Sequence, residues 1–390
     1  MQTNLDNIYL DYAASTPVRE EVLEAMLPWL NENFGNPSSI HSHGRKLRTK
    51  LDECRDKISN ALNCSADEII FHSGATEGDN WALKSLAKTN QNKGRHFIIS
   101  GIEHHAVVES AEYLKKNGYE YTLVNPSSDG VVSTEDIQAA IRQDTTFISL
   151  MMVNNELGTV QPVEKVARLA KSRDILTHTD CAQAFTTQDI DLQTMPVDIL
   201  TTTAHKFYGP IGSGFNFVRR DTRIEPLIHG GSHEFGFRAG TENVAGIVGM
   251  AKALELAVNE RDKMVLKYFE MGNWMLESLK REIPSIQLVG DADKKAPHIY
   301  CLRIPGVNAG NLHNQFDAVG ISIATQSACA SASAEPGHVM RAIGYKAPEA
   351  FETFRISFGI YTSKAELEKF ISVLKEITDS QLSGCNNNGK

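Results

Sequence analysis

Residues 175–206 read ILTHTDCAQAFTTQDIDLQTMPVDILTTTAHK, and this stretch contains two apolar runs of strand length, 175–180 and 197–205. Both runs are rich in Ile, Leu, Val and Thr, the types that favour β-strands. The first run ends at Asp180, and Lys206 directly follows the second. In an open α/β sheet, ligands bind beyond the carboxyl ends of the strands. We therefore expect Asp180 and Lys206 to belong to one binding site.

Further apolar runs on either side of this stretch also predict strands. They are EIIFHSG (68–74), RHFIISG (95–101), EYTLVN (120–125), TFISLMMVN (146–154) and GSGFNFV (212–218). Amphipathic stretches with helical spacing separate the runs, for example EGDNWALKSLAK (77–88) and VEKVARLAKSR (163–173). This alternation predicts an α/β domain with a mostly parallel, seven-stranded sheet and helices on both faces.

The last third of the chain has a different pattern. A long helical pattern begins near residue 245, shorter strand-like runs follow it, and the chain closes with another helical stretch. We interpret this part as a smaller α+β domain that the N-terminal segment completes. The sequence thus predicts a large domain over residues 15–260 and a small domain built from residues 1–14 and 261–390.

Composition narrows the class of protein. The chain has 390 residues, 41% of them hydrophobic, and a net charge of −9, so we expect no direct binding to nucleic acid or to a membrane. The N-terminus lacks a signal-peptide pattern, and no apolar run reaches transmembrane length. The six cysteines form no CxxC pair, and the histidines show no metal-ligand spacing. We therefore expect a cytoplasmic protein with reduced thiols and no metal.

Polar groups directly follow five of the predicted strands. They are Gly74-Ala75-Thr76-Glu77, Glu103-His104-His105, Asn154-Asn155-Glu156, Asp180 with Gln183, and His205-Lys206. Taken singly, Asp180 is more often a helix N-cap, Lys206 a surface lysine and His104 a core histidine. A cofactor site at one sheet edge accounts for all five groups together.

The chemical types of these groups suit pyridoxal 5'-phosphate (PLP). The Gly-Ala-Thr turn offers N–H groups at a helix N-terminus for a phosphate. Asp180 can pair with the pyridinium nitrogen, and Lys206, with a pKa lowered by desolvation, can form the Schiff base. His104 can stack on the ring and move protons, while Asn155 and Gln183 can hydrogen-bond the ring oxygen.

The chain resembles the cysteine desulfurases, which are fold-type I PLP-dependent transferases. The segments that carry the resemblance span roughly residues 8–360 in the family's order. They are YLDYAASTPV, GNPSSIHSHGRKLR, FHSGATEGDN, EHHAVVES, NNELGTVQP, HTDCAQA, AHKFYGP, HGGSHEFGFRAGTEN, SACASASAEPGHVMRAIG and FRISFG.

The resemblance implies a role for each matching residue. Lys206 would be the Schiff-base lysine, Asp180 the pyridinium partner and His104 the stacking acid/base. Arg355 would bind the substrate carboxylate, a bidentate task that suits arginine. Asn155 and Gln183 would contact the ring oxygen, and Asn155 would also lie at the substrate. The phosphate would be held by Ala75, Thr76, Thr203 and His205, with Thr241 contributed by the second subunit of a homodimer.

The resemblance also implies that Cys329 takes the sulfur of L-cysteine as a persulfide, releases L-alanine and passes the sulfur to an acceptor protein. Cys329 lies in the small-residue run SACASASA (327–334), which suits a mobile carrier. Iron–sulfur cluster assembly, tRNA thiolation and DNA phosphorothioation are the pathways we consider. Selenocysteine lysis, another PLP reaction such as aminotransfer, and a non-catalytic interaction module remain the alternatives.

Overall fold

The computed structural model describes residues 7–325 and 336–387. Within these residues the main sheet has seven strands in the order β2-β8-β7-β6-β5-β3-β4. β8 is antiparallel to both of its neighbours, and the other pairs are parallel. The strands are β2 (Ile69–His72), β3 (His96–Ser100), β4 (Glu120–Val124), β5 (Thr145–Ser149), β6 (Leu176–Asp180), β7 (Ile199–Thr203) and β8 (Gly214–Val218). The predicted fold class, with its mostly parallel sheet, is confirmed.

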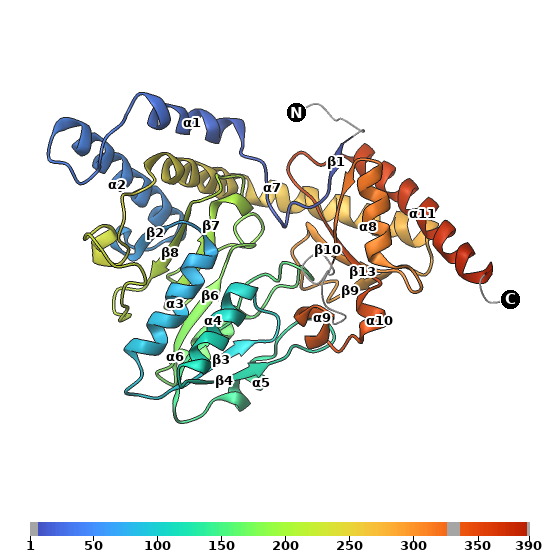
Figure 1. The fold of residues 1–390 in the computed structure, drawn as a ribbon, viewed down its shortest axis with the longest axis horizontal. Coiled ribbons are helices and arrows are strands. Elements are labelled where there is room, and N and C mark those ends of the chain that lie inside the picture. Colours follow the sequence, from blue (N-terminus) through green and yellow to red (C-terminus); the bar gives the residue numbers. More distant parts are fainter. Residues whose placement is uncertain (1–6, 326–335, 388–390) are drawn as a thin grey trace.

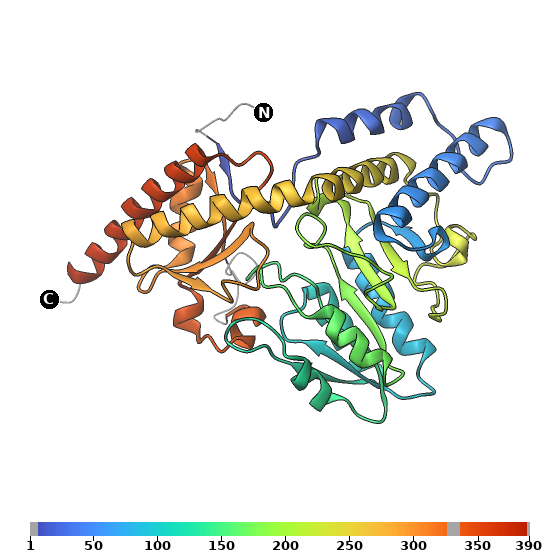
Figure 2. The same ribbon diagram turned by 180° about the vertical axis from the view of Figure 1, so that it is seen from behind.

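Helices cover both faces of this sheet, as the alternating pattern predicted. α3 (Ala75–Thr89) and α4 (His105–Lys116) lie in front of the sheet in Figure 1 and bury one apolar stripe each. α6 (Val163–Lys171) lies on the opposite face, in front in Figure 2. The short helix α5 (Thr134–Ala140) packs beside α6.

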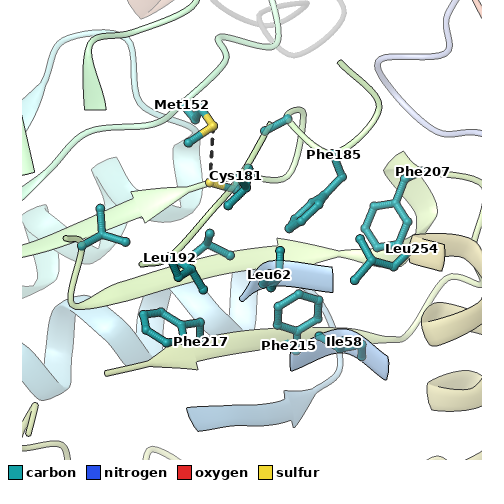
Figure 3. Close-up of a cluster of buried hydrophobic side chains, with 14 of the residues drawn as sticks. Ile58, Leu62, Met152, Cys181, Phe185, Leu192, Phe207, Phe215, Phe217 and Leu254 are labelled. Atoms are coloured by element: carbon teal, nitrogen blue, oxygen red, sulfur yellow. Dashed lines mark hydrogen bonds between the residues drawn. The ribbon is translucent and has the colours of Figure 1, made fainter. Parts of the chain in front are cut away.

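The main core lies between the sheet and the helices α1 (Glu20–Asn31) and α2 (Ser42–Leu62) together with a long helix, α7 (Val244–Glu282). Figure 3 shows Ile58 and Leu62 of α2 against Phe215 and Phe217 of β8. Cys181, one residue beyond the end of β6, points into this core and contacts the sulfur of Met152 at 3.9 Å. The core therefore lies directly beneath the strand end that carries Asp180.

A second group of strands follows α7. It forms a four-stranded antiparallel sheet, β12-β13-β10-β9, and a two-stranded sheet in which β1 pairs with β11. The strands are β1 (Ile8–Tyr9), β9 (Gln287–Val289), β10 (Ile299–Arg303), β11 (Ile321–Ser322), β12 (Ala324–Thr325) and β13 (Thr353–Ser357). The helices are α8 (Ala309–Ala318), α9 (His338–Ala342), α10 (Ala347–Ala350) and α11 (Lys364–Asn387).

The N-terminal segment packs on this second group of strands. Ile8 and Leu10 join a separate apolar cluster with residues of β10, β13 and α11. α7 runs from the main sheet to these strands (Figures 1 and 2), so the predicted domain division at residue 260 falls inside this helix. That division stays a prediction. No helix within the described ranges combines the length and the apolarity that crossing a membrane requires.

Gly78 sets how closely α3 approaches the sheet. A Cβ atom added there would lie 2.5 Å from Asn216 Oδ1, 2.6 Å from Thr201 Cγ2 and 2.7 Å from His72 Nε2. All three neighbours are buried, so none can move aside freely. The glycine therefore fixes the position of the α3 N-terminus over the strand ends.

We predict that Gly78→Ala lowers the free energy of unfolding by about 1–3 kcal/mol, because the added methyl overpacks the interface between helix and sheet. Urea denaturation followed by circular dichroism measures the effect. Lys88→Ala, on the exposed side of the same helix, serves as the control and is expected to change stability by less than about 0.5 kcal/mol. A Gly78→Ala protein as stable as the wild type would contradict this account of the packing.

Candidate active site

A cavity of about 520 Å³ opens beyond the carboxyl ends of β2, β3, β5, β6 and β7. Each of these five strand ends contributes to its wall, as the sequence predicted. The predicted site residues that line it are Ala75, Thr76, His104, Asn155, Asp180, Gln183, Thr203, His205, Lys206 and Arg355. The structure therefore brings these residues together, while the role of each stays a prediction.

One end of the cavity is formed by the N-terminus of α3. Gly74 precedes this helix with φ of +154°, a conformation that L side chains rarely adopt. The first N–H groups of a helix have no carbonyl partner within it and carry a positive partial charge. A carboxylate in the same turn, Glu77, is paired with Arg238 at 2.9 Å. This end of the cavity can therefore bind an anion such as a phosphate.

Asp180 ends β6 and is only 4% exposed. Its Oδ1 atom accepts a hydrogen bond from the backbone N–H of Ala182 at 2.8 Å. The following residues form turns rather than a helix, so Asp180 caps no helix. Burial raises the pKa of Asp180, whereas His104 and Lys206 lower it. A cation at this carboxylate would favour its ionised form, as a pyridinium nitrogen does.

Lys206 follows β7 in a short 3₁₀ turn, Ala204–Lys206. Its Nζ atom donates hydrogen bonds to the carbonyl oxygens of Ala13 at 2.7 Å and Ala14 at 2.8 Å. Burial, assisted by the nearby Arg355, lowers the pKa of Lys206 from 10.5 to about 8. Lys206 is therefore a cavity lysine that has a substantial neutral fraction near physiological pH.

Arg355 comes from β13 and reaches the same cavity from the second group of strands. Its Nη1 atom donates to the carbonyl oxygen of Asn155 at 2.7 Å, and its Nη2 atom lies 2.5 Å from Asp11 Oδ1. Among the described residues, its buried Nε has no hydrogen-bond partner. A guanidinium held in this way can bind a carboxylate.

His104 is the N-cap of α4, and its Nδ1 atom accepts a hydrogen bond from Ala106 N at 3.1 Å. This bond orients the ring, which is exposed at the cavity and is not a core histidine. Desolvation by the surrounding protein lowers the pKa of His104. Asp180 raises this pKa, whereas Lys206 lowers it further. The lowered pKa favours the neutral form of His104 at pH 7, which can exchange a proton through its other ring nitrogen.

Two further predicted residues make contacts that the sequence did not indicate. Gln183 donates from Nε2 to the carbonyl oxygen of Ala13 at 2.7 Å. His205 contacts Ser15 Oγ at 3.2 Å, and burial lowers the pKa of His205 to about 4. Both contacts tie the cavity to the N-terminal segment.

The structure does not place every predicted residue in this cavity. Thr241 lines a neighbouring cavity of about 170 Å³, which shares Ser73 and Gly212 with the first. Its predicted action across a subunit boundary stays a prediction. Cys329 lies outside the described residues.

Sequence reasoning assigned no role to several residues of the site. Ala13, Ala14, Met151 and Val153 line the cavity, and Asp11 holds Arg355. The segment around Asp11 carries part of the family resemblance, and this resemblance was the one signal that Asp11 matters. The residue that Asp11 contacts, Arg355, lies far away in the sequence.

We predict that Lys206 of the unliganded chain titrates near pH 8. Because its pKa is lowered, the reactive neutral amine appears about two units below the pH at which an ordinary lysine reacts. Acetylation at a series of pH values, read by peptide mass spectrometry, measures this pKa, with the other lysines of the same digest as reference. Asp180→Asn should lower the value further, since Asp180 raises it. Titration of Lys206 near pH 10.4 would contradict the burial argument.

Comparison with known proteins places the chain in a family. Residues 8–370 match the aminotransferase class-V family. The chain is 43% identical over 372 residues to the cysteine desulfurase IscS of Dictyoglomus turgidum, covering 95% of this chain and 94% of that protein. A solved NifS-like protein superposes with a TM-score of 0.90 at 34% identity, covering 96% of this chain and 99% of the other. The structure of SspA in complex with cysteine gives 0.78 at 34% identity, with 92% and 100% covered.

These matches extend over nearly the whole chain and agree with the cavity at the strand ends. The chain belongs to the cysteine desulfurases of the aminotransferase class-V family and is a PLP-dependent enzyme.

Proposed function

We propose that this enzyme converts L-cysteine to L-alanine and transfers the sulfur to Cys329, which becomes a persulfide. The observation that carries the proposal is the convergence of Lys206, Asp180 and Arg355 on one cavity. Asp180 and Arg355 come from separate strands and Lys206 from the turn after a third, and burial raises the free energy of each charge. Their convergence is explained if they hold a cofactor and the carboxylate of an amino acid.

The residues present fit PLP. The N-terminus of α3, with Ala75, Thr76, Thr203 and His205, would hold the phosphate. Asp180 would pair with the pyridinium nitrogen, and Lys206 would bind the aldehyde carbon. PLP supplies an electron sink for the substrate's Cα when it is bound.

The remaining chemistry belongs to the chain's own side chains. Arg355 binds the substrate carboxylate and so fixes the orientation of Cα. The neutral amine of Lys206 accepts the Cα proton, which its lowered pKa favours. His104, which lines the same cavity, would return a proton.

The sulfur step balances without an external oxidant. The Cys329 thiolate forms an S–S bond with the substrate sulfur while the substrate C–S bond breaks. The electrons of that bond, with one proton, become a C–H bond of alanine. A thiolate must make this attack, because a protonated thiol is a poor nucleophile.

The other cysteines whose side chains are described are poor candidates for this step. Burial raises the pKa of Cys54 to about 11 and that of Cys64 to about 12. Burial also raises the pKa of Cys181 and of Cys301. Since each of these four thiols would be protonated at neutral pH, none of them is suited to supply the attacking thiolate.

We further infer a cytoplasmic homodimer that passes its sulfur to an acceptor protein, in iron–sulfur cluster assembly or in sulfur modification of tRNA or DNA. Exposed apolar side chains on and after α1 support a covering second copy. Leu30 is 62% exposed and Phe34 70% exposed. Large apolar groups gathered on one surface indicate a protein interface.

The test is to incubate the purified enzyme with L-cysteine and a reductant, and to quantify sulfide and alanine. Wild type should release both products in equal amounts. Cys329→Ala and Lys206→Ala should each lose at least about 100-fold in rate, because each removes a group that reacts directly. Cys64→Ala is the control and should keep its activity. Full activity of Cys329→Ala would overturn the persulfide role and indicate a selenocysteine lyase or another PLP lyase.

A further inference from the structure

Residues 10–16, which we call the N-terminal crossing segment, connect the two parts of the active site. Leu10 O accepts from Ser357 N at 2.8 Å, and Ala13 N donates to Ser357 Oγ at 2.8 Å. At its other end, Thr16 N donates to His205 O at 2.9 Å. The segment is therefore fixed both to β13, which carries Arg355, and to the turn that carries Lys206.

Asp11 is the charged residue of this segment, and its carboxylate forms an ion pair with Arg355. The Nη2–Oδ1 distance is 2.5 Å, and the exposed fractions of the two side chains are 11% for Arg355 and 20% for Asp11. The ion pair is therefore partly removed from water, where charges interact more strongly than on an open surface. Burial raises the pKa of the nearby Tyr9, Asp11 raises it further, and Arg355 lowers it.

The charges around Lys206 come from several elements. Arg355 of β13 lowers the pKa of Lys206, whereas Asp180 of β6 and Asp11 raise it. The imidazoles facing Lys206 are His104 of α4 and His205 of its own turn, and Lys206 lowers the pKa of both. Asp180 and Asp11 are thus the two anions that offset the effect of Arg355 on Lys206.

We propose that Asp11 is a positioning residue that holds the Arg355 guanidinium at the cavity and balances its charge beside Lys206 until a substrate carboxylate arrives. This inference rests on the proposed function. Asp11 and Arg355 have opposite effects on the pKa of Lys206, so Asp11 offsets part of the effect of Arg355.

The test titrates the visible absorbance of bound PLP against pH, which reports protonation of the Lys206 nitrogen and requires no turnover. Asp11→Asn should lower the titration midpoint by about 1 unit, because Arg355 is left unbalanced. Arg355→Gln should raise it by at least as much, since Arg355 has the larger influence on Lys206. The double variant should lie between the two single variants, since both charges are gone. Asp11→Glu should stay near wild type.

Asp189→Asn is the matched control, because Asp189 pairs with Arg261 at 2.8 Å and neither residue is among those lining the cavity. Its midpoint should not move. A double variant that shifts as far as Asp11→Asn alone would overturn the proposal, because a misplaced segment is not repaired by removing a second charge. An unchanged midpoint in Asp11→Asn would also overturn it.

The same variants can be compared without cofactor, by the pH dependence of Lys206 acetylation. If the wild type takes up no PLP, the proposed function fails. The acetylation series still tests Asp11, because the midpoint for Lys206 should again be lower than wild type in Asp11→Asn and higher in Arg355→Gln. Failure of the charge balance and failure of the proposed function are thereby distinguished.

Discussion

The structure depends on the burial of opposite charges beyond the carboxyl ends of parallel strands. Asp180 is almost fully buried at the end of β6, and Lys206 follows β7, its neighbour in the sheet. A buried charge is costly unless it has partners, so each group is tied into contacts that also define the cavity. The cost appears as pKa values displaced from their ordinary positions, upward for Asp180 and downward for Lys206. Such displacements suit groups that must bind a cofactor and exchange protons.

The rest of the fold holds these charges in place. The apolar core of Figure 3 lies beneath Asp180 and gives the strand end a rigid base. Gly78 brings α3 close enough to present its N-terminus at one end of the cavity. The N-terminal crossing segment links the turn after β7 to β13, so that Lys206 and Arg355 line one cavity although β7 and β13 belong to different sheets. The site is therefore built at the junction of two separately packed apolar clusters.

The sequence was sufficient to predict the α/β class, the seven-stranded sheet and the meeting of five strand ends. These features follow from short-range patterns: strand-length apolar runs, and polar residues placed directly after them. Asp11 shows where such reasoning stops. Its partner Arg355 lies 344 residues away, and no local pattern connects a carboxylate in an N-terminal segment with a guanidinium in the last strand. The carbonyl of Ala13, which receives both Lys206 and Gln183, is a backbone group and carries no signal of residue type.

We propose that PLP binds to Lys206, which lines the cavity at the strand ends. The chain offers a direct competitor, because burial lowers the pKa of Lys295 to about 7 as well. Lys295, however, lies over the Tyr300 ring and donates to Ala296 O at 2.9 Å, outside the cavity at the strand ends. Reduction of the holoenzyme with borohydride, followed by peptide mapping, identifies the modified lysine. We expect a phosphopyridoxyl group on Lys206 alone; the group on Lys295, or on no lysine, would show that Lys206 does not hold the cofactor.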